Sequence, residues 1–115
     1  MYTLSEANMK LPAFEQEPED AFIVRYAPVT LRCKAAPASQ VYFRCNGDFV
    51  KAKIHTRLES VDGAGVHHIE TSVAVTRDDV EEYLALNGFW CECVAWSVAG
   101  STKSQRARVD IACKY

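Results

Sequence analysis

Short runs in which apolar and polar residues alternate recur along this chain, and turn-forming residues separate them. In the clearest run, Val29, Leu31, Cys33 and Ala35 alternate with polar side chains. This period of two is typical of a β-strand with one buried and one exposed face. Several such runs at short spacing indicate an all-β sandwich.

The remaining strands follow from the same pattern. Pro12 and Pro18 mark an edge strand, where a residue without an N–H is tolerated. Asn46-Gly47-Asp48 predicts a turn with positive φ, and Asp62 to Gly65 predicts a hairpin turn. Further strands are expected over 41–45, 49–53, 54–61, 66–75, 89–98 and 101–112.

One stretch is expected to be helical. Thr76-Arg77-Asp78-Asp79 has the form of a capping box, in which the Thr hydroxyl and the third-position carboxylate satisfy backbone donors. The helix is predicted to run to about Leu84, and Asn87-Gly88 to end it.

Composition fits one compact domain of 115 residues, with 49% hydrophobic and 24% charged residues. A net charge of −2 argues against a dedicated nucleic-acid binder. No 18-residue apolar run occurs, and Met1 to Lys10 lacks the features of a secretory signal, so the chain is expected to be soluble as given. We find no catalytic triad, phosphate loop or carboxylate pair, and predict neither enzyme activity nor a cofactor.

Five cysteines in so short a chain suggest either an oxidising compartment or a bound metal. Cys91 and Cys93 share one face of a strand, so each can meet a separate partner. A zinc-stabilised intracellular binding domain is the alternative, with thiolates from Cys33, Cys45, Cys91 and Cys93. Their spacing lacks the usual pair of zinc knuckles, which weakens this alternative.

The last hairpin resembles the F and G strands of an intermediate-set immunoglobulin domain. Such domains commonly show Cys-x-Ala-x-Asn-x-x-Gly and a later Ala-x-Leu-x-Val, matched here by Cys93, Ala95, Gly100, Ala107, Val109 and Ile111, with Ser97 in place of Asn. The resemblance implies a two-sheet Greek-key sandwich in which a disulfide from Cys33 to Cys93 joins the sheets.

The same resemblance places Phe43 where these domains usually carry a buried Trp. An antiparallel register that sets Phe43 opposite Cys93 also sets Cys45 opposite Cys91, so an extra cross-strand disulfide, Cys45 to Cys91, is expected. Cys113 is left over as a free thiol, a partner for a missing segment or an intermolecular link.

Three segments, VYFRCNGDFV, GFWCECVAWS and STKSQRARVDIA, make the resemblance more specific. Together they look like the first immunoglobulin domain of the uncoordinated-five netrin receptors. The polar, aperiodic residues 1–10 are expected to be a flexible terminus, followed by an immunoglobulin-like domain over 11–113 and a stub toward the next domain over 114–115. The resemblance implies the extracellular part of a single-pass plasma-membrane receptor acting in axon guidance and cell repulsion. Expected partners are netrin, fibronectin-leucine-rich transmembrane proteins and glypicans or heparan sulfate.

Residues that alternate with the cysteines are expected to face outward from the C-F-G sheet and to bind a partner: Tyr42, Arg44, Trp90, Val94, Trp96, Arg106 and Arg108. Two Trp beside Arg residues have the composition of a binding hot spot. The alternative is a cation-π ladder, in which Arg side chains cover the Trp rings without any partner.

Two further surfaces are candidates. Phe49, Val50 and Lys51 match positions that the family resemblance links to the leucine-rich partner, although a Phe beside a Lys is also ordinary on an edge. Lys51, Lys53 and Arg57 form a weak candidate for sulfated glycans, with a solvated face as the alternative. His55, His67 and His68 are not expected to share a metal, because adjacent residues on a strand point to opposite faces.

Overall fold

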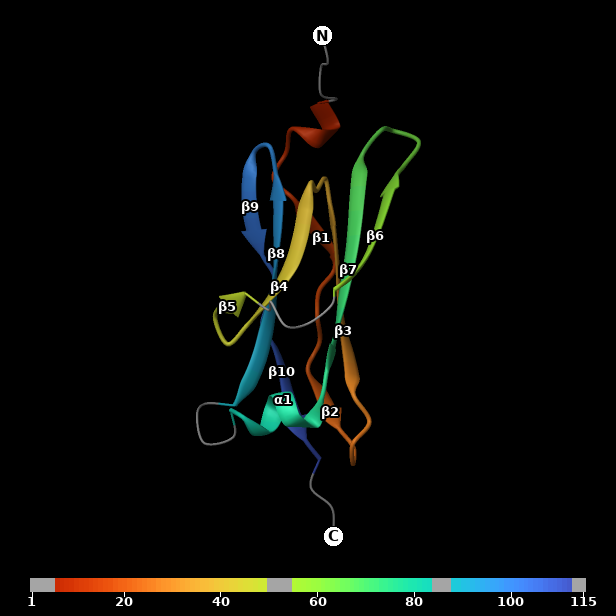
Figure 1. Cartoon of the computed structure of the whole chain (residues 1–115). Coiled ribbons are helices and arrows are strands. Elements are labelled where there is room, and N and C mark those ends of the chain that lie inside the picture. The colour runs from red at the N-terminus through yellow and green to blue at the C-terminus, as the bar shows by residue number, and fades with distance from the viewer. Residues whose placement is uncertain (1–5, 50–54, 84–87, 113–115) are drawn as a thin grey trace.

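A computed structural model describes residues 6–49, 55–83 and 88–112 and shows two β-sheets packed face to face (Figure 1). The first sheet has the order β1-β3-β7-β6, formed by Ala13–Gln16, Val29–Ala36, His67–Val75 and Thr56–Val61. The second has the order β2-β10-β8-β4-β5, formed by Ala21–Ile23, Ala107–Ile111, Phe89–Ser97, Gln40–Cys45 and Asp48–Phe49. Strand β9, Gly100–Lys103, also pairs with β8. The predicted all-β sandwich is confirmed.

The core lies between the sheets and is built from alternate residues of the long strands. In β3 and β7 the buried set is Leu31, Cys33, Ala35, Ile69, Thr71, Val73 and Val75, as the sequence pattern predicts. The buried hydroxyl of Thr71 donates to the carbonyl of Val41 at 3.0 Å, so it keeps a partner across the core. Phe43 is fully buried, at the position expected for the large aromatic of strand C.

Both expected disulfides are present. Cys33 on β3 is bonded to Cys93 on β8 and joins the two sheets, with Cα atoms 6.4 Å apart. Within the second sheet, Phe43 lies opposite Cys93 and Cys45 opposite Cys91, and the latter two form the second disulfide. The zinc alternative is therefore wrong, because all four cysteines are bonded in pairs and leave no thiolate for a metal.

Helix α1, Arg77–Glu81, begins with the predicted capping box. The N–H of Asp79 donates to the Thr76 hydroxyl at 3.3 Å, and the Thr76 N–H donates to the Asp79 carboxylate at 2.8 Å. The helix ends three residues before the expected Leu84, which lies outside the described residues, as does Asn87. No helix in the described part of the chain is long and apolar enough to cross a membrane.

Two features of the sheets differ from the sequence prediction. Strand β2 was not expected; it is only three residues long and pairs in parallel with β10, so it carries too short an alternation to detect. The last strand was expected to be continuous but is divided into β9 and β10. Ser104 causes the division, because its backbone N–H donates to the Cys93 carbonyl while its hydroxyl accepts the Cys93 N–H at 2.8 Å.

The N-terminal part of the described chain carries a 3₁₀ turn, η1, formed by Glu6–Asn8. It lies at the end of the sandwich where the β6–β7 and β8–β9 turns also lie (Figure 1). The chain then enters β1 in the first sheet and passes by way of the buried Pro18 to β2 in the second. The N-terminal segment therefore contributes a strand to each sheet.

Candidate partner-binding surface

The outer face of the second sheet carries aromatic and cationic side chains. Tyr42 and Arg44 come from β4, Trp90 and Trp96 from β8, Lys103 from β9, and Arg106 and Arg108 from the chain in and before β10. The register places Arg108 opposite Trp90, and Tyr42 opposite Val94. We call this set, Tyr42, Arg44, Trp90, Trp96, Lys103, Arg106 and Arg108, the outer aromatic face.

Trp96 is the most open large ring of this face, with 42% of the residue exposed. Its indole N–H donates to the hydroxyl of Tyr42 at 3.2 Å, which fixes the ring across two neighbouring strands. A Trp whose polar atom is already bonded presents mainly apolar surface to solvent. Such a ring is a suitable anchor for a protein partner.

The three arginines of the outer aromatic face are held by local contacts. The Arg106 guanidinium lies 3.9 Å from the centre of the Trp90 ring, so the cation-π alternative is realised at this pair. The Arg108 side chain bonds to Asp110 at 3.2 Å, and Arg44 donates to the Gly47 carbonyl at 2.9 Å. These contacts stop short of Trp96, whose ring keeps its exposure.

Val94 corrects the sequence prediction, which counted it among the partner-binding residues. It has the outward direction of Trp96, yet only 3% of it is exposed. Tyr42 and Lys103 flank it on the neighbouring strands, and Tyr42 and Trp96 are bonded to each other beside it. A small side chain between larger ones is covered by them, which strand alternation alone does not reveal.

Glu92, which the sequence reasoning did not single out, has the same direction on β8 as Trp90 and Trp96. It lies opposite Arg44 and is only 8% exposed. The antiparallel register that sets Phe43 opposite Cys93 also sets Arg44 opposite Glu92, so the pairing of these two opposite charges can be predicted from the sequence.

The second candidate surface lies largely outside the described residues. Val50, Lys51 and Lys53 belong to the undescribed segment 50–54, and Phe49 is described only as backbone of β5. Arg57 is exposed on β6, where it pairs with Glu59 and donates to the Ser39 carbonyl at 3.3 Å. The ring of His55 accepts the N–H of Phe43, a residue of β4 in the second sheet, at 3.3 Å. His67 and His68 belong to β7 in the first sheet. The three histidines therefore do not form one site.

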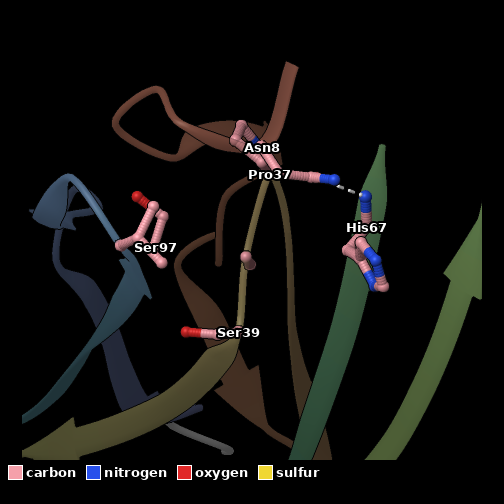
Figure 2. A pocket seen from close by; sticks show the side chains of 7 residues that line it. Asn8, Pro37, Ser39, His67 and Ser97 are labelled. Carbon is pink, nitrogen blue, oxygen red and sulfur yellow. Dashed lines mark hydrogen bonds between the residues drawn. The ribbon is translucent and has the colours of Figure 1, made fainter. Parts of the chain in front are cut away.

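A shallow pocket of about 190 Å³ lies beside Ser97, at the end of the sandwich that carries η1 (Figure 2). Its lining comes from η1, the β3–β4 connection, the start of β7 and the β8–β9 turn, namely Asn8, Pro37, Ala38, Ser39, His67, Ser97 and Val98. The hydroxyls of Ser39 and Ser97 donate to backbone carbonyls of Trp96 and Lys10. The pocket therefore offers a mostly apolar wall.

Comparison with known proteins decides the family. The family model described as the netrin receptor unc-5 N-terminal domain matches residues 6–109. The chain belongs to this unc-5 family. It is 47% identical over 103 residues to the netrin receptors UNC5D of Rattus norvegicus and Mus musculus, a match covering 89% of this chain and 11% of each relative.

Structural similarity places the unc-5 domain among immunoglobulin-like folds. A chain from the crystal structure of a titin and obscurin-like 1 Ig complex matches it with a TM-score of 0.53 and 21% identity. The match covers 88% of this chain and 92% of that one. At this level of identity the similarity establishes the fold, and the predicted immunoglobulin-like sandwich is confirmed.

Sequence reasoning also missed how the first sheet of this unc-5 domain uses His68. The ring bonds through Nδ1 to Glu15 and through Nε2 to Asp62, the latter at 2.8 Å. These hydrogen bonds, first that of Asp62 and then that of Glu15, raise the pKa of His68, and the bond to His68 is the main cause of the lowered pKa of Asp62. No local motif predicts this contact, because Glu15 and His68 are 53 positions apart.

Proposed function

We propose that this unc-5 domain is a recognition module in the extracellular part of a single-pass plasma-membrane netrin receptor acting in axon guidance and cell repulsion. Its family membership and its two disulfides, which suit an oxidising compartment, support this location. Netrin is the first partner we propose, on the strength of the family name. Fibronectin-leucine-rich transmembrane proteins and glypicans follow from the sequence resemblance.

We further propose that protein partners contact the outer aromatic face. The observation that carries this proposal is the exposed Trp96 ring, whose N–H is bonded to Tyr42. Binding hot spots are enriched in Trp, Tyr and Arg, and all three residue types lie on this face. Trp90, with Arg106 stacked on its ring, lies six residues before Trp96 on β8 and would form a second contact on the same face.

The edge formed by Phe49, Val50 and Lys51 is the second proposed contact, for the leucine-rich partner. It is supported by the sequence resemblance and by the position of β5 at the edge of the second sheet. Lys51, Lys53 and Arg57 are the proposed contact for a glypican or heparan sulfate, supported by charge alone.

Binding of immobilised netrin and of a leucine-rich partner to Trp96→Ala and Phe49→Ala tests the outer aromatic face and the Phe49 edge separately. We expect Trp96→Ala to weaken netrin binding about tenfold or more, because removal of a hot-spot ring typically costs at least that much affinity. We expect Phe49→Ala to weaken mainly the leucine-rich partner. Leu58→Ala is the matched control, because Leu58 is a large exposed residue on β6 of the opposite sheet. If folded Trp96→Ala and Phe49→Ala bind as the wild type does, both surfaces are wrong.

A further inference from the structure

His68 lies on β7 with a carboxylate at each ring nitrogen. Only 18% of its side chain is exposed, against 41% for Glu15 and 43% for Asp62. A protonated ring donates from both nitrogens, whereas a neutral ring donates from only one. Both contacts are therefore satisfied together only while His68 carries its proton.

The local backbone conformation positions each of the two carboxylates. Glu15 is the extra residue at a register shift of β1, where Phe14 pairs with Ala35 and Gln16 with Lys34. Such a bulge redirects a side chain, here toward β7. Asp62 opens the β6–β7 turn, where its Oδ1 accepts the N–H groups of Ala64 and Val66 at 2.8 and 3.1 Å, leaving Oδ2 for His68.

The surroundings of His68 are mostly acidic. Lys34 on β3, Glu59 on β6 and Glu70 on β7 line the hollow that contains His68, together with Leu58 and Ser60. The carboxylates of Glu15 and Asp62 bond to the ring itself, whereas that of Glu59 pairs with Arg57. This arrangement favours the charged imidazolium, in agreement with the raised pKa of His68.

The strand that carries Glu15 continues from a segment that touches both sheets. On one side, Asn8 donates to the Gly65 carbonyl at 2.8 Å. It also accepts the His67 N–H at 3.0 Å (Figure 2). On the other side, the hydroxyls of Ser97 and Thr102 donate to carbonyls of the same segment, at Lys10 and Pro12.

The contact with the β8–β9 turn is close. A Cβ atom on Gly100 would lie 3.1 Å from the Leu11 side chain. Residues 8–12 therefore run from the β6–β7 turn to the β8–β9 turn, and Asn8 lines the pocket at this end of the sandwich. A change in the local stability of β1 would therefore alter the contacts of residues 8–12 with both turns.

We propose that Glu15, Asp62 and His68 form a proton-dependent clasp that fastens the N-terminal segment to the first sheet and so regulates the β8–β9 turn beside Trp96. The clasp itself depends only on the fold, while its regulatory role rests on the proposed partner-binding function. When His68 loses its proton, one carboxylate loses its donor, and β1 opens locally more often. The domain is thus held more firmly in acidic surroundings than in alkaline ones.

Amide hydrogen exchange of the 115-residue chain, corrected for intrinsic rates, tests the clasp at about pH 5.5 and about pH 8, the range over which His changes charge. We expect protection of the β1 amides to fall about two- to fivefold at the higher pH, a size typical of partly exposed ion pairs. His68→Gln, which cannot take up a proton, should remove this response. His67→Gln is the matched control and should retain it.

A wild-type β1 whose protection is unchanged between the two pH values, or one whose response survives in His68→Gln, overturns the clasp. The amides of β9 and of the β8–β9 turn report on the regulatory step. If the protection of these amides does not fall together with that of the β1 amides, the proposed link to Trp96 is wrong. No partner is present in this experiment, so a failure of Trp96→Ala to weaken binding counts against the proposed function and leaves the clasp standing.

Discussion

Asn46 and Trp90 are joined by a reciprocal pair of backbone and side-chain hydrogen bonds. The Asn46 N–H donates to the Trp90 carbonyl at 2.8 Å, and the Trp90 N–H donates to the Asn46 side-chain oxygen at 3.3 Å. The Asn46 amide also donates to the Gly88 carbonyl at 2.9 Å. The turn after β4 thus fixes the start of β8, and with it the position of Trp90 on the outer aromatic face.

Replacing Asn46 tests this link. Asn46 has a φ of 51°, a conformation that costs an ordinary side chain about 1–2 kcal/mol. Asn46→Ala combines that strain with the loss of two side-chain hydrogen bonds, so we expect the free energy of unfolding to fall by about 2–3 kcal/mol. Asn46→Gly keeps the conformation and loses only the bonds, so its loss should be smaller. Urea denaturation measures both; equal losses would contradict a role for the backbone conformation.

The turn at Asn46 also shows what the sequence reveals about the fold. Asn-Gly after an alternating run predicts positive φ, and the structure has it at both Asn46 and Gly47. Alternation placed the core, and the register relating Phe43 and Cys93 placed the second disulfide. These features are local or follow from one register. Strand β2 and the division at Ser104 depend on contacts with distant strands, which the local pattern does not contain.

The two disulfides should contribute unequally to stability. The Cys33–Cys93 bridge spans 60 positions, and its removal should lower the free energy of unfolding by about 4 kcal/mol on the chain-entropy model. The Cys45–Cys91 bridge lies within that loop and should contribute less. Denaturation of Cys33→Ala/Cys93→Ala and of Cys45→Ala/Cys91→Ala measures this order, and a larger loss in the second double variant would contradict it.

Thiol counting tests the pairing itself. Five cysteines with four in bridges leave one titratable thiol in a denatured, unreduced monomer. Its mass should lie four hydrogens below that of the reduced chain. A count of five thiols would show that neither bridge forms in solution.

The stack of Arg106 on Trp90 allows stabilisation to be separated from binding. Arg106→Gln removes the cation and should lower the free energy of unfolding by about 0.5–1 kcal/mol. Arg32→Gln is the control, because Arg32 is exposed on β3 in the opposite sheet. If Arg106→Gln weakens netrin binding by more than Arg32→Gln, in proteins of matched fold, Arg106 contacts the partner; binding equal to that of the control assigns Arg106 to the ladder alone.

How far the candidate surface could be predicted is illustrated by Trp96 and Val94. Alternation gave both the same outward direction, and for Trp96 this sufficed. For Val94 it did not, because exposure depends on the size of the flanking side chains and on the bond between Tyr42 and Trp96. The direction of a side chain follows from its own strand, whereas the exposure of Val94 on β8 depends also on the side chains of β4 and β9.

The pair of His68 and Asp62 predicts a definite dependence of stability on pH. The pKa of His68 is raised above its ordinary value of 6.5, so its contribution is complete below that value and is lost as the pH rises through the folded-state pKa. The pKa of Asp62 is lowered from 3.8, so its contribution is complete above 3.8 and is lost as the pH falls through the folded-state pKa. The combined contribution should therefore be largest between pH 3.8 and 6.5.

Because many other groups titrate, the quantity to measure is the difference in unfolding free energy between the wild type and His68→Gln at each pH. It should be greatest within that window and shrink on both sides, as each member of the pair loses its charge. His67→Gln is the control, because His68 and not His67 bonds to Glu15 and Asp62. A His68→Gln difference that grew as the pH rose above 6.5 would have the wrong sign for a raised pKa and would contradict the assignment.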